Sequence, residues 1–179
     1  MTALLNAVPA AGVIFSRLSR LTPLGLGELS LLGDAERTPR RFASRREIMH
    51  EGDPIREPRA LLSGWACHQR ILSDGRRQIL HFLLPGDLLG QCRHDKPLAA
   101  TTVLALQEVL ICSLPAAAPS TPLAEAYHRS AALEEHHLFA QITRLGRLNA
   151  YERLADWLLE TLDRLALVGL STGDRFALP

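Results

Sequence analysis

The apolar and polar positions divide the chain into three regions of different rhythm. Between residues 37 and 120, short apolar segments alternate with turn-forming residues at intervals of about ten residues. The turn signals are Glu51-Gly52-Asp53-Pro54, Ser63-Gly64, Asp74-Gly75 and Pro85-Gly86-Asp87. This spacing is typical of an all-β sandwich or barrel, so we predict an antiparallel, jelly-roll-like β-domain over residues 37–120.

Two strand pairs are predicted inside this region. Residues 65–72 and 76–84 flank Asp74-Gly75, which favours a two-residue type I′ hairpin because both central residues of that turn need positive φ. Residues 99–105 and 109–114 are joined by the tight connection Leu106-Gln107-Glu108, and we predict that they pair with each other.

The regions on either side are helical, which makes the expected fold class α+β. Residues 1–36 form an N-terminal arm in which prolines and glycines limit helix length, with short helices expected around 13–20 and 27–32. A long helix is predicted over residues 121–147. Thr121 is its N-cap, Pro122 its first helical residue and Gly146 its stop.

A further amphipathic helix follows the long one. Asn149 to Glu152 resembles a capping box, and helical spacing of apolar residues continues to Gly169. Residues 175–178 then look like a strand with no partner strand after them. The simplest expectation is that residues 148–179 begin another domain whose remainder is absent from this sequence.

Composition excludes several classes of protein. The chain is 47% apolar and 22% charged with a net charge of +1, which is ordinary for a globular protein and gives no support to a generally basic nucleic-acid-binding surface. There is no signal-peptide pattern, and no apolar run approaches the roughly 20 residues that cross a bilayer. We therefore expect a cytoplasmic protein without membrane contact.

Candidate chemistry is sparse. No nucleophile–base pairing or P-loop is visible, so we predict no catalytic residue and no enzyme activity. The histidines form no HxH or HxxxH pattern, and Cys67, Cys92 and Cys112 are isolated, so no metal ligands are assigned. Cys92, beside Arg93 and His94, is the one thiol whose surroundings favour a lowered pKa. The cofactor is unknown, with haem or a redox cofactor left open as alternatives.

Four stretches together resemble the Crp/Fnr family of bacterial transcription regulators. They are Gly64-Trp65-Ala66, residues 74–79 (DGRRQI), residues 85–90 (PGDLLG), and Glu152-Arg153-Leu154-Ala155 with Leu158-Leu159. The resemblance implies a cyclic-nucleotide-binding-type β-roll, a long dimerisation helix and the start of a winged helix-turn-helix domain. It also implies a homodimer that, at full length, contacts DNA and RNA polymerase and is allosterically controlled.

The resemblance further implies a ligand pocket, whose rim would include Leu89, Gly90, Gln91, Ala99, Ala100 and Thr101. Nucleotide-binding members carry a glutamate for the ribose, then an arginine and a small hydroxyl residue for the cyclic phosphate, an anion that suits an arginine fork. Here Gln91 stands at the glutamate position and Ala99 or Ala100 at the arginine position, while Arg93 and Lys96 lie elsewhere in the loop. We therefore predict an effector other than cAMP, or a constitutive regulator without a small ligand.

The long helix carries a candidate dimer seam. Ala131, Leu138, Ile142 and Leu145 recur at steps of three, four and seven residues, as a coiled-coil seam requires, whereas His128 and Glu135 would interrupt it. Polar residues there could set the register or carry a ligand signal.

Two alternatives stay open at this stage. One is a stand-alone ligand-sensing domain without DNA binding. The other is a cupin-like metalloenzyme, which shares a β-barrel and glycine turns but would need an HxH-plus-glutamate set that this sequence lacks.

Overall fold

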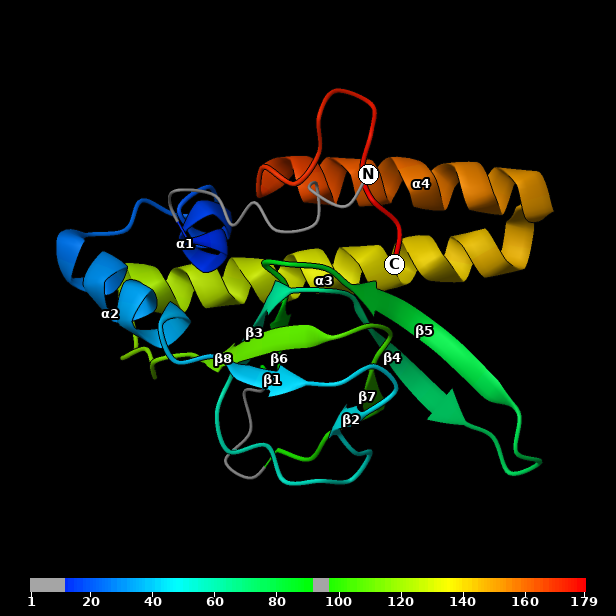
Figure 1. Ribbon diagram of the computed structural model, residues 1–179, viewed down its shortest axis with the longest axis horizontal. Coiled ribbons are helices and arrows are strands. Elements are labelled where there is room, and N and C mark those ends of the chain that lie inside the picture. Colours follow the sequence, from blue (N-terminus) through cyan, green and yellow to red (C-terminus); the bar gives the residue numbers. More distant parts are fainter. Residues whose placement is uncertain (1–11, 92–96) are drawn as a thin grey trace.

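The computed structural model describes residues 12–91 and 97–179. Helices α1 (Val13–Leu18) and α2 (Leu26–Glu36) precede eight strands, and α3 (Pro122–Arg147) and α4 (Ala150–Leu167) follow them (Figure 1). The strands are β1 (Arg40–Phe42), β2 (Glu47–Met49), β3 (Arg59–Ser63), β4 (Ala66–Ile71), β5 (Arg77–Leu83), β6 (Leu88–Leu89), β7 (Thr102–Ala105) and β8 (Val109–Ser113). The predicted α+β class is confirmed.

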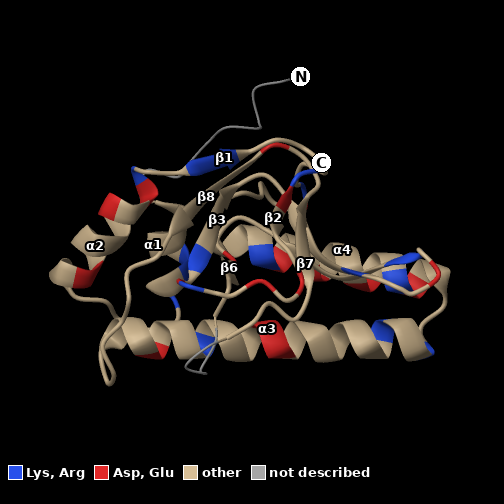
Figure 2. Cartoon of the chain, turned by 90° about the horizontal axis from the view of Figure 1, so that it is seen from below, with Lys and Arg blue, Asp and Glu red and all other residues tan. Residues whose placement is uncertain are grey.

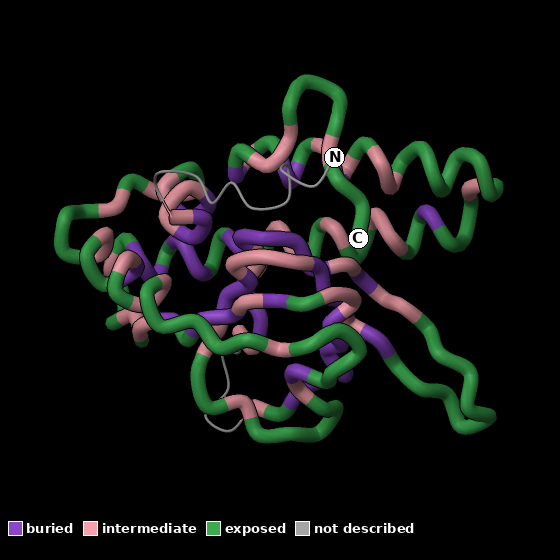
Figure 3. Tube along the Cα trace, viewed as in Figure 1, coloured by how far each residue is buried: buried purple, intermediate pink, exposed green. Residues whose placement is uncertain are grey.

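The strands form two antiparallel four-stranded sheets, ordered β1-β8-β3-β6 and β2-β7-β4-β5. The predicted pairing of β4 with β5 is confirmed, with Ala66 opposite Leu83 and Ile71 opposite Arg77. Buried side chains such as Leu61, Val103 and Val109 fill the space between the sheets. This arrangement is a β-roll that hides an apolar core and leaves the far end of the β4–β5 hairpin exposed (Figure 3).

The predicted pairing of residues 99–105 with 109–114 is wrong. β7 pairs with β2 and β4, whereas β8 pairs with β1 and β3 in the other sheet. The connection 106–108 turns a corner between the sheets, and Leu106 N donates to Trp65 O at 2.9 Å. Sequence neighbours usually pair, but two central strands find better partners far away along the chain.

The predicted type I′ turn is also wrong, because Gly75 (φ +83°) has positive φ and Asp74 does not. Gly75 N donates to Leu72 O at 2.9 Å and Leu72 N to Arg76 O at 2.8 Å, which gives a type I turn closed by a left-handed glycine. The Asp74 carboxylate accepts from Arg76 N at 3.0 Å and stabilises this three-residue loop.

The caps of α3 and α4 match their predictions at three of four ends. Thr121 Oγ1 accepts from Ala124 N at 3.2 Å, and Asn149 and Glu152 form the expected capping box. α4 ends at Leu167, just before Gly169 (φ +72°).

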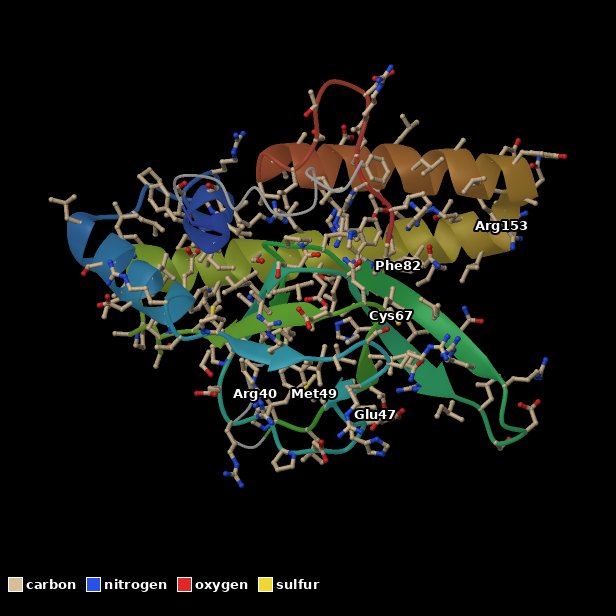
Figure 4. All side chains as sticks on the ribbon, in the orientation of Figure 1. Arg40, Glu47, Met49, Cys67, Phe82 and Arg153 are labelled. Carbon is tan, nitrogen blue, oxygen red and sulfur yellow. The ribbon has the colours of Figure 1, made fainter. Side chains whose placement is uncertain are left out.

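The fourth end differs, because α3 continues through Gly146 to Arg147. Arg153, at the turn between the helices (Figure 4), donates to Leu145 O at 2.9 Å and Leu148 O at 2.7 Å. These bonds satisfy carbonyls at the helix end, so no left-handed glycine is needed there.

The helices cover one side of the roll. α1, α2 and the start of α3 share an apolar cluster that includes Ile14, Leu18, Leu32 and Leu123, and α2 is longer than predicted. α4 runs back along α3, so both long helices lie beside the roll (Figure 1). Within the described residues, no helix is both long and apolar enough to span a membrane.

Candidate effector cavity and buried polar cluster

A cavity of about 610 Å³ lies between the roll and α3. Roll residues on its wall include Ile55, Pro58, Gly90, Gln91 and Pro97, and α3 contributes Ala124, Tyr127, His128 and Ala131. Its volume suits a small organic molecule. A ligand there would touch the roll and α3 together.

The structure separates the six predicted rim residues. Gly90 and Gln91 line the cavity, whereas Leu89 is buried beside a smaller neighbouring cavity of about 70 Å³. Ala99, Ala100 and Thr101 are not on the wall of the large cavity. Gly90 is required by packing, because its φ is +71° and a Cβ would lie 3.2 Å from Ile55 Cγ2.

The segment around Ala99 and Ala100, where nucleotide-binding members hold the cyclic phosphate, is hydrogen-bonded to the roll. Ala99 N donates to Asp53 O at 2.9 Å, and Ala99 O accepts from Gly52 N at 2.8 Å. Ala99 is buried and Ala100 is exposed, and neither side chain carries a charge. Cys92, Arg93, His94 and Lys96 lie outside the described residues.

The described structure places Arg56, Glu57 and the imidazole of His128 on the cavity. The Glu57 carboxylate accepts from Ser113 Oγ at 2.5 Å. Tyr127 directs its hydroxyl away to Pro115 O, at 3.0 Å, and burial raises the pKa of this phenol. The described part of the wall therefore combines small apolar side chains with Arg56 and Glu57 of the segment before β3 and the imidazole of His128 on α3.

The predicted dimer seam is partly exposed. Leu138, Ile142 and Leu145 are 39%, 65% and 43% exposed, and neighbouring Phe139 is 61% exposed. Ala131 instead lines the cavity and so does not share their surroundings.

A second feature, which the sequence analysis missed, is a buried polar cluster between the roll and the helices. Its members are Arg17, His68, His81, Asp87, Glu134, His137 and Arg164. They come from α1, β4, β5, the β5–β6 turn, α3 and α4, so no local sequence pattern brings them together. The sequence held one signal for this cluster, because His68 and His81 lie among apolar residues in predicted strands, a position that indicates burial.

Asp87 and Arg164 form the ion pair at the centre of this cluster, with side chains only 14% and 6% exposed. The same guanidinium donates to Phe82 O at 2.9 Å, and the Asp87 carboxylate accepts from Leu84 N at 2.7 Å. Burial alone would raise the pKa of Asp87, but the Arg164 charge, the bond from Leu84 N and the Arg17 charge outweigh burial and lower it. The PGD turn is thus an anchor for α4.

The histidines of the cluster are neutral near pH 7. Burial lowers the pKa of His68 and of His137 to about 4, and burial together with the Arg164 charge lowers that of His81 to about 3. Burial and the Asp87 charge raise the pKa of Glu134 to about 7. His68 Nε2 and Glu134 Oε1, 3.6 Å apart, are therefore not a charged pair at neutral pH.

Metal and thiol chemistry find no geometric support in the described part of the chain. No three His, Cys, Asp or Glu side chains in residues 12–91 and 97–179 are arranged to hold a metal ion. Burial raises the pKa of the Cys67 thiol and raises that of Cys112 to about 11, which disfavours reactive thiolates.

Acidic and basic residues are interspersed on the helices and strands (Figure 2).

The β-roll is similar in sequence to a known family of domains. Residues 39–119 match the family of cyclic nucleotide-binding domains. No curated protein sequence matches the chain.

Solved structures agree with the domain match. FixK2 from Bradyrhizobium japonicum is 30% identical with a TM-score of 0.63, and the alignment covers 71% of this chain and 66% of that protein. A CRP-family transcriptional regulator from Thermus thermophilus is 28% identical with a TM-score of 0.60, over 76% of this chain and 68% of that one. A CRP/FNR-family regulator from the same organism, 19% identical with a TM-score of 0.55 over 76% and 69%, shows the shared fold. This chain thus spans about two thirds of the length of these proteins.

Proposed function

We propose that this chain, which belongs to the CRP/FNR family of transcriptional regulators, is the sensing and dimerising part of a cytoplasmic DNA-binding regulator. The observation that carries the proposal is the cavity between the roll and α3, on a helix that also exposes large apolar side chains. A ligand that prefers one position of α3 would shift the population of that position. Its signal would reach a partner copy through the same helix.

The effector is proposed to be something other than cAMP. A cyclic phosphate needs a positively charged fork, and the two positions where one would stand hold Ala99 and Ala100. Gln91, on the cavity wall, replaces the carboxylate that would bind a ribose. The described part of the wall favours a ligand with an apolar body and a polar or charged group near Arg56 or His128.

The partner of α3 is proposed to be a second copy of the chain. Leu138, Phe139, Ile142 and Leu145 expose apolar surface on one helix, and such clustered exposure marks an interaction site. DNA and RNA polymerase would be contacted by the full-length dimer, with α4 as the first helix of the DNA-binding domain.

Sedimentation equilibrium tests the dimer. The chain should sediment at twice 19.7 kDa, and the double variant Leu138→Glu, Ile142→Glu should sediment at 19.7 kDa because two charges would enter the seam. Ile71→Glu is the matched control, since Ile71 is 58% exposed at the end of β4, far along the hairpin from α3. A concentration-independent mass of 19.7 kDa for the unmodified chain would contradict dimerisation.

A further inference from the structure

The C-terminal half of α4 is docked on the sensor. Thr161, Leu165 and Val168 are buried there, while Tyr151 and Leu154 in its first turns are 88% and 54% exposed. Trp157 packs on Phe82, with ring centroids 5.2 Å apart; Phe82 is labelled in Figure 4. The second half of α4 is therefore docked on the roll. Its first half is bound to α3, through Arg144 and Asp156 at 2.8 Å and through the bonds of Arg153 to Leu145 O and Leu148 O.

The polar part of this docking is Arg164 and its partners. Besides Asp87, Arg164 binds Glu160 at 3.0 Å, and Glu160 also accepts from Arg144 of α3 at 2.7 Å. Removing one partner of a buried ion pair leaves the other charge poorly compensated, so we expect the loss of Asp87 or of Arg164 to loosen α4.

Polar side chains lie between this pair and the loop segment next to the cavity. Thr101 lies four residues after Pro97, which lines the cavity, and its Oγ1 is 2.7 Å from His68 Nδ1. His68 Nε2 faces Glu134 of α3 at 3.6 Å and has no hydrogen-bond partner among the described residues. Glu134 and Asp87 line the same small cavity of about 10 Å³, too small for a ligand.

We propose that Asp87 and Arg164 form a latch that holds α4 on the sensor, and that Thr101, His68 and Glu134 connect this latch to the effector cavity. The inference rests on the proposed function, because it assigns the regulation of that same cavity. A shift of α3 by a few tenths of an ångström would close or widen the gap between His68 and Glu134. The shift would thereby change the surroundings of Asp87.

Hydrogen exchange of the 179-residue chain, read by mass spectrometry, tests the latch. In Arg164→Met, the amides of α4 should exchange at least tenfold faster, while those of β7 and β8 keep their rates. Asp87→Asn should give the same pattern, and the double variant should exchange no faster than either single variant. Arg76→Met is the matched control, since Arg76 pairs with Asp74 on the exposed hairpin.

Two results would overturn the latch. Unchanged α4 exchange in both single variants would show that the pair does not hold the helix. Equal acceleration of α4, β7 and β8 would show a contribution to global stability alone.

A pair of neighbouring threonines tests the connection to the cavity. Thr101→Val removes the hydroxyl that binds His68 and should speed α4 exchange at least threefold. Thr102→Val is the control, because Thr102 Oγ1 accepts from Glu51 N at 3.1 Å, whereas the hydroxyl bonded to His68 is that of Thr101. Equal effects of the two variants on α4, or no effect of Thr101→Val, would overturn the connection.

These measurements need no effector and no DNA, and each variant is compared with the unmodified chain at the same protein concentration. A monomeric chain, or a chain without a ligand, would therefore contradict the proposed function and leave the exchange results readable. Conversely, a dimer whose α4 ignores Arg164→Met would keep the proposed function and remove the latch.

Discussion

At the scale of single residues, several titratable side chains are buried in the interior of the protein. His81 is 6% exposed, stacks on His137 at 5.7 Å and lies 3.3 Å from an Arg164 nitrogen. Protonation would place a cation beside another buried cation, so the folded chain keeps this imidazole neutral. The histidine thereby makes the stability of the fold depend on pH.

The direction of this dependence follows from the two states of His81. Its pKa is near 6.5 when unfolded and about 3 when folded. Between these values the unfolded chain binds more protons, so the stability present above pH 6.5 is lost as pH falls toward 3. From pH 6.5 to pH 5, His81 alone should lower the free energy of unfolding by about 1.5 kcal/mol.

Urea unfolding of the chain and of His81→Gln at the two pH values measures this contribution. The variant should lose less stability on acidification. An identical loss in both proteins would show that His81 is not the responsible group. Glu134 acts in the opposite sense, because its raised pKa removes stability as pH rises from 4.5 to about 7.

At the scale of elements, the PGD turn is a junction between the roll and two helices. Gly86 has φ +95°, and a Cβ there would lie 2.8 Å from Val168 Cγ1, just past α4, and 3.3 Å from Arg17 Cβ of α1. The turn needs glycine both for its backbone conformation and for the close approach of its neighbours. Asp87, the next residue, then meets Arg164.

We predict that Gly86→Ala destabilises the chain much more than Gly75→Ala. Gly75 has a similar φ of +83°, but no atom lies within 4 Å of the place that a Cβ would occupy, so alanine there costs only the backbone strain of roughly 1–2 kcal/mol. At Gly86, overpacking against α1 and α4 adds about 1–3 kcal/mol. Chemical denaturation of both variants gives the difference, and equal destabilisation would refute close packing at this junction.

At the scale of the whole molecule, a cavity lies between the roll and α3, and in residues 12–91 and 97–179 no arginine stands at Ala99 or Ala100. The cavity lies against α3, which also exposes the apolar seam. α4 folds back along α3, so the cavity, the exposed apolar residues and the Asp87–Arg164 pair all involve two adjacent helices (Figure 1).

Isothermal titration calorimetry with cAMP tests the prediction that the effector is not cAMP. We predict no saturable binding, which means a dissociation constant weaker than about 1 mM. A thermal-shift screen of 2-oxo acids and haem serves as the search for the true effector class. Micromolar binding of cAMP that Gln91→Ala abolishes would overturn the prediction.

The sequence alone determined the local structure of this protein. The caps at Thr121 and Asn149, the turn glycines and the alternation of apolar residues are signals between near neighbours, and they predicted the β-roll followed by two long helices. The absence of a cation at Ala99 and Ala100 was equally readable, because it depends on residue type at aligned positions.

Only the tertiary structure decided which distant residues meet. β7 and β8 are neighbours in sequence but belong to different sheets, and α3 passes through Gly146 because Arg153 binds the carbonyls at its end. The pairing of Asp87 with Arg164 joins residues 77 positions apart. Such contacts follow from how sheets and helices pack against one another rather than from local preference. Through one of them, Asp87 of the Pro85-Gly86-Asp87 turn holds α4 by its ion pair with Arg164.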